Sequence, residues 1–132
     1  MNKFTVNIDG IYLGVIRTVD IDAETWFVAS DVTTVLGFDP SSETINKNVD
    51  YRDIELFNAN VENRIDKMIF INESGFYSLL LNSELQLAKS FRHWVTNKVL
   101  QQLIKQGTVD NDILDCKQVR IWKTFVTAKQ NI

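Results

Sequence analysis

Apolar and polar residues alternate from Phe4 to Ile8, and Asp9-Gly10 is a pair typical of tight turns. An extended β-rich run from Ile11 to Val19 follows, so the start of the chain predicts a β-hairpin. Trp26 to Val28 predicts a further short strand. Together these segments indicate a small antiparallel sheet.

Two short helices are predicted next. The first begins at Ala29 or Ser30 and ends at Gly37. Asp39 is the candidate cap of the second, and Pro40 suits a helix start because its missing N–H would be unpaired there anyway. The second helix is expected to run to about residue 47.

Residues 51–63 are expected to be irregular or short-stranded, and the run Arg64–Ile71 predicts a strand. Asn72 can cap a helix that begins at Glu73, whose carboxylate suits the positive end of that helix. Asn82 or Ser83 is expected to end it.

A longer helix is predicted from Glu84 to Gly107, where glycine favours a left-handed stop. Its apolar residues recur every three or four positions and predict one buried face: Leu87, Ala88, Phe91, Val95, Val99 and Leu103. Arg92 falls within this stripe, so we expect it to be structural and bonded to an acidic residue or a carbonyl. His93 is expected to face solvent.

These elements predict an α+β fold in which a small antiparallel sheet with an N-terminal hairpin packs against several helices. The helices include a short helix-turn-helix-like pair and a long C-terminal helix. With 132 residues and 45% hydrophobic positions, the chain suits one globular domain plus an appendage. No apolar run reaches the roughly 20 residues that a membrane crossing needs, and the N-terminus is too polar for a secretion signal.

Cys116 is the only cysteine and His93 the only histidine. The chain therefore cannot form an intramolecular disulfide or a four-ligand Cys/His zinc site, and a reducing intracellular compartment is compatible. We expect no metal and no cofactor. No Gly-x-Ser-x-Gly elbow and no phosphate loop is present, and the pair Cys116 and His93 has no supporting pattern. The sequence thus argues against an enzyme.

The net charge of −3 is unevenly spread. Residues 1–60 carry four basic and ten acidic residues, residues 61–107 carry six and four, and residues 108–132 carry four and three. An acidic first half opposes binding to phosphate, because binding requires cations that displace the counterions of DNA.

Several motifs, in order, resemble the Bro-N module, which is the amino-terminal domain of viral baculovirus-repeated-ORF proteins and of many phage antirepressors. The ordered set covers roughly residues 4–107 and consists of Trp26–Val32, Val35–Phe38, Val49-Asp50, Phe70–Tyr77 and Phe91–Val95. The resemblance implies a viral or phage regulator that binds DNA or modulates transcription, in the nucleus or cytoplasm of an infected host cell. We therefore divide the chain into a Bro-N-like domain, 1–107, and an amphipathic helical extension, 108–132.

The predicted helix pair looks like a helix-turn-helix element that presents its second helix to a DNA groove. The candidate contacts are hydroxyl, amide and amine side chains that bind phosphate or base edges: Ser41, Ser42, Thr44, Asn46 and Lys47. Related modules commonly carry several Lys or Arg residues here, whereas Lys47 stands nearly alone beside Glu43. The alternative is a helix pair that only packs under the sheet.

A second candidate DNA surface is a face of the sheet lined by four scattered cations: Arg17, Arg52, Arg64 and Lys67. The alternative is that these are solvated charges that flank strands and discourage edge pairing.

The segment 108–132 predicts an amphipathic helix that is basic toward its end. Three of its apolar residues are candidates for a partner or dimer contact: Ile121, Trp122 and Phe125. The helix folds back onto the domain, pairs with a second copy in a homodimer, or leads into a further domain, and we favour packing within or between protomers. The overall prediction is a non-enzymatic, DNA-binding regulatory module. The alternative is a module that binds a repressor or host regulatory protein without contacting DNA.

Overall fold

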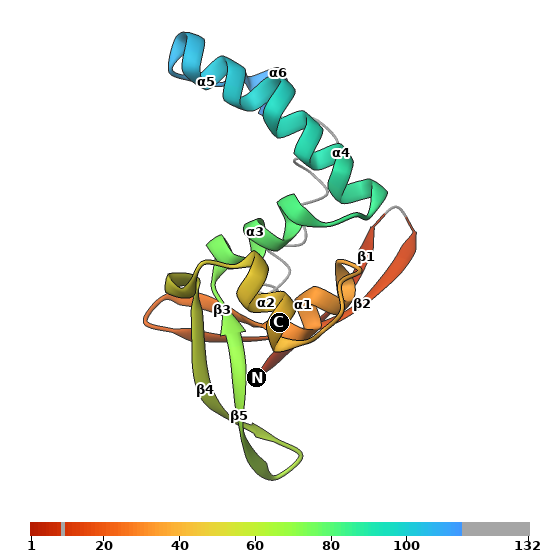
Figure 1. Cartoon of the computed structure of the whole chain (residues 1–132), viewed down its shortest axis with the longest axis vertical. Helices are drawn as coiled ribbons and strands as arrows, with labels where there is room; N and C mark the ends of the chain where they lie inside the picture. The colour runs from red at the N-terminus through yellow and green to blue at the C-terminus, as the bar shows by residue number, and fades with distance from the viewer. Residues whose placement is uncertain (9, 115–132) are drawn as a thin grey trace.

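The computed structural model describes residues 1–8 and 10–114, which form a five-stranded antiparallel sheet and a set of helices (Figure 1). The strand order is β1-β2-β3-β5-β4. The strands are β1 (Asn2–Ile8), β2 (Ile11–Ile21), β3 (Glu24–Val28), β4 (Ile54–Val61) and β5 (Arg64–Ile71). The predicted α+β class and the N-terminal hairpin are confirmed.

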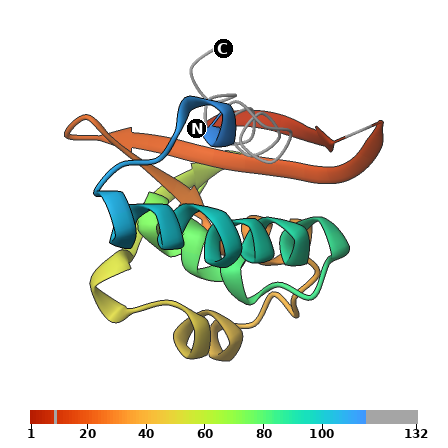
Figure 2. The same cartoon turned by 90° about the horizontal axis from the view of Figure 1, so that it is seen from above.

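The helices α1, α2 and α3 and the long helix that starts with α4 gather on one side of the β1–β2 hairpin (Figure 2). Their bounds are α1 (Ala29–Val35), α2 (Ser42–Asn48), the 3-10 turn η1 (Tyr51–Asp53), α3 (Glu73–Asn82), α4 (Gln86–Trp94), the π-helical segment η2 (Val95–Val99), α5 (Leu100–Gln106) and α6 (Asn111–Leu114). Helices and sheet share one main core.

The sheet consists of a three-stranded meander, β1 to β3, and a hairpin, β4 and β5, that meet along a short seam. Strand β3 pairs with β5 only through Phe27 opposite Ile71 and Val28 opposite Phe70. Because successive side chains of a strand point to opposite faces, the residues of this seam belong to two apolar clusters. Phe27 and Ile71 are buried in the main core beneath the helices, whereas Val28 and Phe70 are buried in a second cluster with Trp26. The second cluster therefore joins β3 to the β4–β5 hairpin.

Helix α3 sits directly against the end of β5. Its cap Asn72 accepts a hydrogen bond from the Gly75 N–H at 2.9 Å, as predicted. A Cβ on Gly75 would lie 2.9 Å from the Ile71 Cβ, so only glycine allows this approach. The helix then buries Phe76, whose ring stacks on Phe27 at a centroid distance of 5.6 Å.

The start of α2 differs from the prediction. Ser41 is the cap, because its hydroxyl accepts a hydrogen bond from the Thr44 N–H at 3.2 Å. Asp39 and Pro40 precede this cap and lie outside the helix. The connection between α1 and α2, residues 36–41, is also longer than the turn of about 3–4 residues in a helix-turn-helix motif.

The segment 51–63, which we expected to be irregular or short-stranded, contains η1 and the eight-residue strand β4. Strand β4 lies at the sheet edge and pairs with β5 along its whole length. Its turn residues Glu62 and Asn63 have φ of 51° and 64°. Such turns usually carry Asn-Gly or Asp-Gly, so the sequence offers little signal for this hairpin.

The helix after α3 begins at Gln86 rather than at Glu84. Ser83 is buried between the two helices, and its hydroxyl donates to the Leu36 carbonyl at 2.7 Å and accepts from the Leu85 N–H at 3.2 Å. This bond ties the start of α4 to the end of α1. Helix α4 therefore begins at the point where the chain is bonded to the end of α1.

The prediction that this helix buries one face as far as Leu103 is wrong. Ala88 is buried and Phe91 packs against the core, but no residue of η2 or α5 is buried. The distal half projects from the rest of the domain (Figure 1). The π-helical turn also shifts the register of the apolar stripe. The predicted left-handed stop at Gly107 is confirmed by its φ of 78°.

Arg92 has the structural role that its place in the stripe indicates. Its guanidinium donates to the Leu81 carbonyl at 2.8 Å, which satisfies one of the two predicted partner types. His93 is exposed, as expected. None of the helices in the described ranges combines the length and apolar character that a membrane crossing requires.

Candidate nucleic-acid interface

The cation Arg17 is held within the fold by Asp31, a residue of the sequence motif at the start of α1. The Asp31 carboxylate accepts three hydrogen bonds from Arg17: from the backbone N–H at 3.0 Å, from Nε at 2.8 Å and from Nη2 at 3.0 Å. Both side chains are largely buried, and the bond to Asp31 raises the pKa of Arg17. Asp31 lies in the first turn of α1, directly after β3, and is the residue that holds Arg17. Arg17 is committed to this contact.

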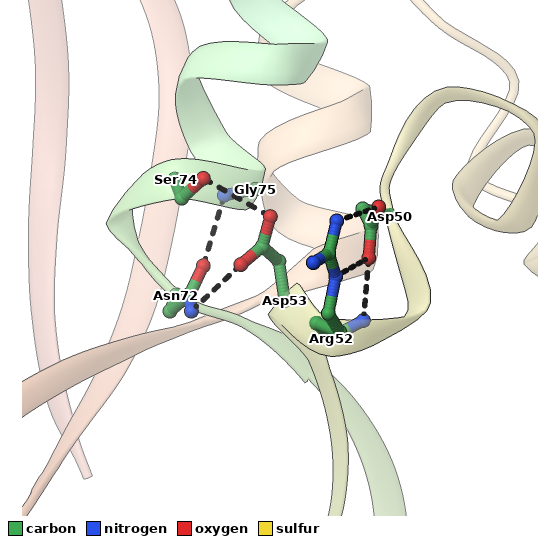
Figure 3. Close-up of polar contacts among 6 residues, drawn as sticks. All are labelled: Asp50, Arg52, Asp53, Asn72, Ser74 and Gly75. Carbon is green, nitrogen blue, oxygen red and sulfur yellow. Dashed lines mark hydrogen bonds and ion pairs between the residues drawn. The ribbon is translucent and has the colours of Figure 1, made fainter.

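The segment from Asp50 to Asp53 anchors η1 to the start of α3 (Figure 3). Asp53 accepts from the Asn72 side chain at 3.2 Å and from the Ser74 hydroxyl at 3.0 Å. Asp50 accepts from the Arg52 backbone N–H and from its Nε and Nη2, each at 2.9 Å. These bonds lower the pKa of Asp50 to about 2. Arg52 therefore lies in a bidentate, solvent-exposed pair.

The four cations proposed for one face of the sheet do not share a face. Arg64 and Lys67 are three positions apart on β5, and side chains at odd separations on a strand point to opposite faces. Arg64 also pairs with Asp66 at 3.3 Å. Since Arg17 is bound to Asp31 as well, the idea of a single cationic sheet face is wrong.

Helix α2 exposes only part of its predicted contact set. The hydroxyls of Ser41 and Thr44 lie 3.1 Å apart within the cap, so both serve the helix end. The remaining candidates are exposed, and they are Ser42, Asn46 and Lys47. Glu43 is exposed beside them. This surface offers one cation and one carboxylate.

A different polar surface lies on the long helix. A groove of about 470 Å³ runs along α4 into η2 and is lined by Gln86, Lys89, Ser90, His93, Trp94, Asn97 and Lys98. Lys89 pairs with Glu84 at 3.1 Å, and both side chains are exposed. An exposed pair of this kind contributes little and opens readily to another anion. We call this surface the α4 groove.

The α4 groove belongs to a segment that lacks acidic residues. From Leu85 to Val109 the chain has no Asp or Glu, while it carries four cations: Lys89, Arg92, Lys98 and Lys105. Within the part of the chain that the structure describes, Lys98 and Lys105 make no ion pair. This surface was not predicted from the sequence, because the charge summed over residues 61–107 hides the acid-free segment and the apolar stripe predicts a helix packed in the core. The run of 25 residues without an acid was the available signal.

The three predicted partner contacts of the C-terminal extension lie outside the described residues: Ile121, Trp122 and Phe125. Only the start of that extension, α6, is described. Residues 1–8 and 10–114 contain no cluster of three or more His, Cys, Asp or Glu side chains that could hold a metal ion.

These features define a small α+β domain that presents a cationic helix beside a sheet whose strands carry equal numbers of basic and acidic residues. Comparison with known sequences agrees with the motifs, because residues 15–101 match the family model described as BRO family, N-terminal domain. The chain belongs to this family. Family membership identifies it as a BRO-type regulatory domain.

Among curated proteins, an uncharacterized protein of Haemophilus influenzae is 29% identical over 89 residues, which cover 67% of this chain and 44% of the relative. Two proteins of Invertebrate iridescent virus 6 are named for a Bro-N domain. Protein 201R is 27% identical over 113 residues (70% of this chain, 27% of the relative), and protein 289L is 28% identical over 101 residues (63% and 24%). The chain thus spans less than half the length of these relatives. No solved structure matches it.

Proposed function

We propose that this chain is a DNA-binding domain of a regulatory protein of viral or phage type and that it contacts DNA through the α4 groove. The observation that supports the proposal is the acid-free segment from Leu85 to Val109, whose three lysines are exposed. Cations that replace condensed counterions supply most of the sequence-independent affinity for DNA. The acidic first half of the chain lies mainly in the sheet and in the helices α1 and α2.

The side chains of the α4 groove suit the surface of a nucleic acid. Lys89 and Lys98 both line the groove and would bind phosphates, while the amides of Gln86 and Asn97 would donate to phosphate or base edges. The indole of Trp94 adds an apolar ring to the same groove. Helix α2 offers less, because Lys47 is its only cation and two of its hydroxyls serve the cap.

The test is a titration of labelled duplex and single-stranded DNA with the full chain at several salt concentrations. Binding should weaken steeply as salt rises, and Lys98→Glu should weaken it by roughly tenfold and reduce the salt slope by about one. Lys3→Glu, an equal charge change on the exposed face of β1, is the matched control. Lys47→Glu should have a smaller effect than Lys98→Glu. No binding at low salt would contradict the function, and a larger loss for Lys47→Glu would move the contact to α2.

A second candidate function is a protein-interaction module that binds a repressor or host regulatory protein without contacting DNA. The exposed apolar residues of α5 and the excess of acidic residues in the first half of the chain favour it. A pull-down from host lysate beside the DNA titration separates the two, because this candidate requires partner capture together with the absence of salt-dependent DNA binding.

A further inference from the structure

The end of the long helix carries an apolar patch that the core does not use. Leu100, Leu103 and Ile104 are spaced i, i+3 and i+4, so they lie on one helix face. Their side chains are 47%, 42% and 86% exposed. A shallow groove of about 260 Å³ runs beside two of them and is also lined by Gln101 and Lys105. We call these three residues the α5 patch.

The helix that carries the α5 patch is well terminated. The Gly107 N–H donates to the Leu103 carbonyl at 3.0 Å in a left-handed cap. The Gln102 side chain accepts from the Asp110 N–H at 2.9 Å and binds the following turn back to the helix. The patch is therefore presented on a formed helix, although no residue of α5 is buried.

The positive charge around the α5 patch indicates that its partner is acidic. Lys105 lines the groove beside the patch, and Lys98, seven positions earlier, lies on the same side of the helix. No acidic residue occurs between Leu85 and Val109. Two copies packed through this patch would bring these like charges toward each other, which is unfavourable. A helix with apolar residues at the same spacing and acidic residues along the flank that faces the lysines would bury the patch and pair with them.

We propose that the α5 patch docks an acidic amphipathic helix of a partner protein. The apolar residues supply the buried contact, and Lys98 and Lys105 orient the partner helix and accelerate its association. The patch is small, so the binding is weak and strongly salt-dependent. The inference does not rest on DNA binding, since the same helix end would dock a protein whether or not the α4 groove binds DNA.

The probe is a synthetic labelled peptide helix with leucines at i, i+3, i+4 and i+7 and glutamates at the flanking positions, titrated with the full chain by fluorescence anisotropy. Saturable binding that weakens with salt is expected, and Ile104→Glu should weaken it by at least about tenfold. The variant should stay folded by circular dichroism, because α5 buries no residue. Leu56→Glu is the matched control, since Leu56 is 53% exposed on β4, away from this helix.

Four results would overturn the inference that the patch docks an acidic helix. The first is no binding of the acidic peptide at low salt, and the second is equal binding of a peptide with lysine at every glutamate position. The third is an equal effect of Leu56→Glu and Ile104→Glu. Light scattering of the full chain adds a fourth measurement, because self-association that Ile104→Glu abolishes would assign the patch to a second copy.

Discussion

The body of the domain and its long helix use charged and apolar side chains in opposite ways. In the body, the arginines of β2, η1 and β5 are each bound to a carboxylate, and the large apolar side chains fill two clusters. In η2 and α5 the lysines are exposed, and in α5 the large apolar residues are exposed as well. A cation or an apolar residue is a stronger candidate for binding where the fold does not already use it. We therefore place both proposed contacts on the long helix. On α2 the exposed Lys47 has Glu43 exposed beside it, and the hydroxyls of Ser41 and Thr44 serve the cap.

The burial of side chains changes abruptly along the long helix. Ala88 of α4 is completely buried, whereas Ile104, on the same continuous helix, is mostly exposed. The first part has the body beneath it, and the second part extends past it (Figure 1). Single substitutions can test this difference between the packed body and the exposed end of the long helix.

Phe76→Ala should lower the free energy of unfolding by about 3–5 kcal/mol, because it leaves a cavity at the stacked contact with Phe27 in the main core. Ile104→Ala should change it by less than about 0.5 kcal/mol. Urea denaturation of both variants measures the contrast. Comparable losses would mean that α5 is part of the core and would remove the basis of the division.

Asp31→Ala should lower the free energy of unfolding by about 2 kcal/mol, because it leaves the Arg17 N–H and guanidinium largely buried without their partner. Arg17→Met in the same variant should recover part of the loss. The control is Asp66→Ala, which breaks an exposed pair with Arg64 and should cost less than about 1 kcal/mol. Equal losses in the two variants would show that the Arg17 contact is no more than a surface pair.

The smallest expected effect concerns Asp50, whose pKa is lowered to about 2 by its bonds to Arg52. A carboxyl with a lowered pKa in the folded state stabilises the fold fully above its unfolded pKa of about 3.9, and the contribution is lost as the pH falls through the folded value. Asp50→Asn keeps an acceptor for the Arg52 N–H but removes the charge. Its stability difference from the wild type should be present at pH 5 and should vanish near pH 2. A difference that is constant over this range would exclude the ion pair as its source.

Much of the fold could be predicted because its signals are local. The bounds of β5 and the start of α3 follow from an apolar run and the Asn72 cap, and Gly107 marks the helix stop. For the segment that forms β4 only an irregular or short-stranded conformation was predicted, because an edge strand depends on its partner and its turn lacks the usual residues. The cap of α2 was misplaced because Asp39, Ser41 and the adjacent proline offer competing local signals.

The candidate site was less predictable. Spacing along the predicted strand places Arg64 and Lys67 on opposite faces, but it does not show that Arg64 pairs with Asp66 or that Arg52 turns back to Asp50. It shows equally well that Leu103 lies on an apolar stripe, but not that the body stops short of it.

The sequence by itself determined the α+β class, the Asn72 cap, the Gly107 stop and the motifs that place the chain in the BRO family, because each depends on residues close together in the chain. Only the tertiary structure decided which charges are neutralised and which apolar residues are covered. These properties depend on what lies across space from a side chain. Arg17 meets Asp31 through the β2 and α1 packing, whereas Ile104 meets no buried surface.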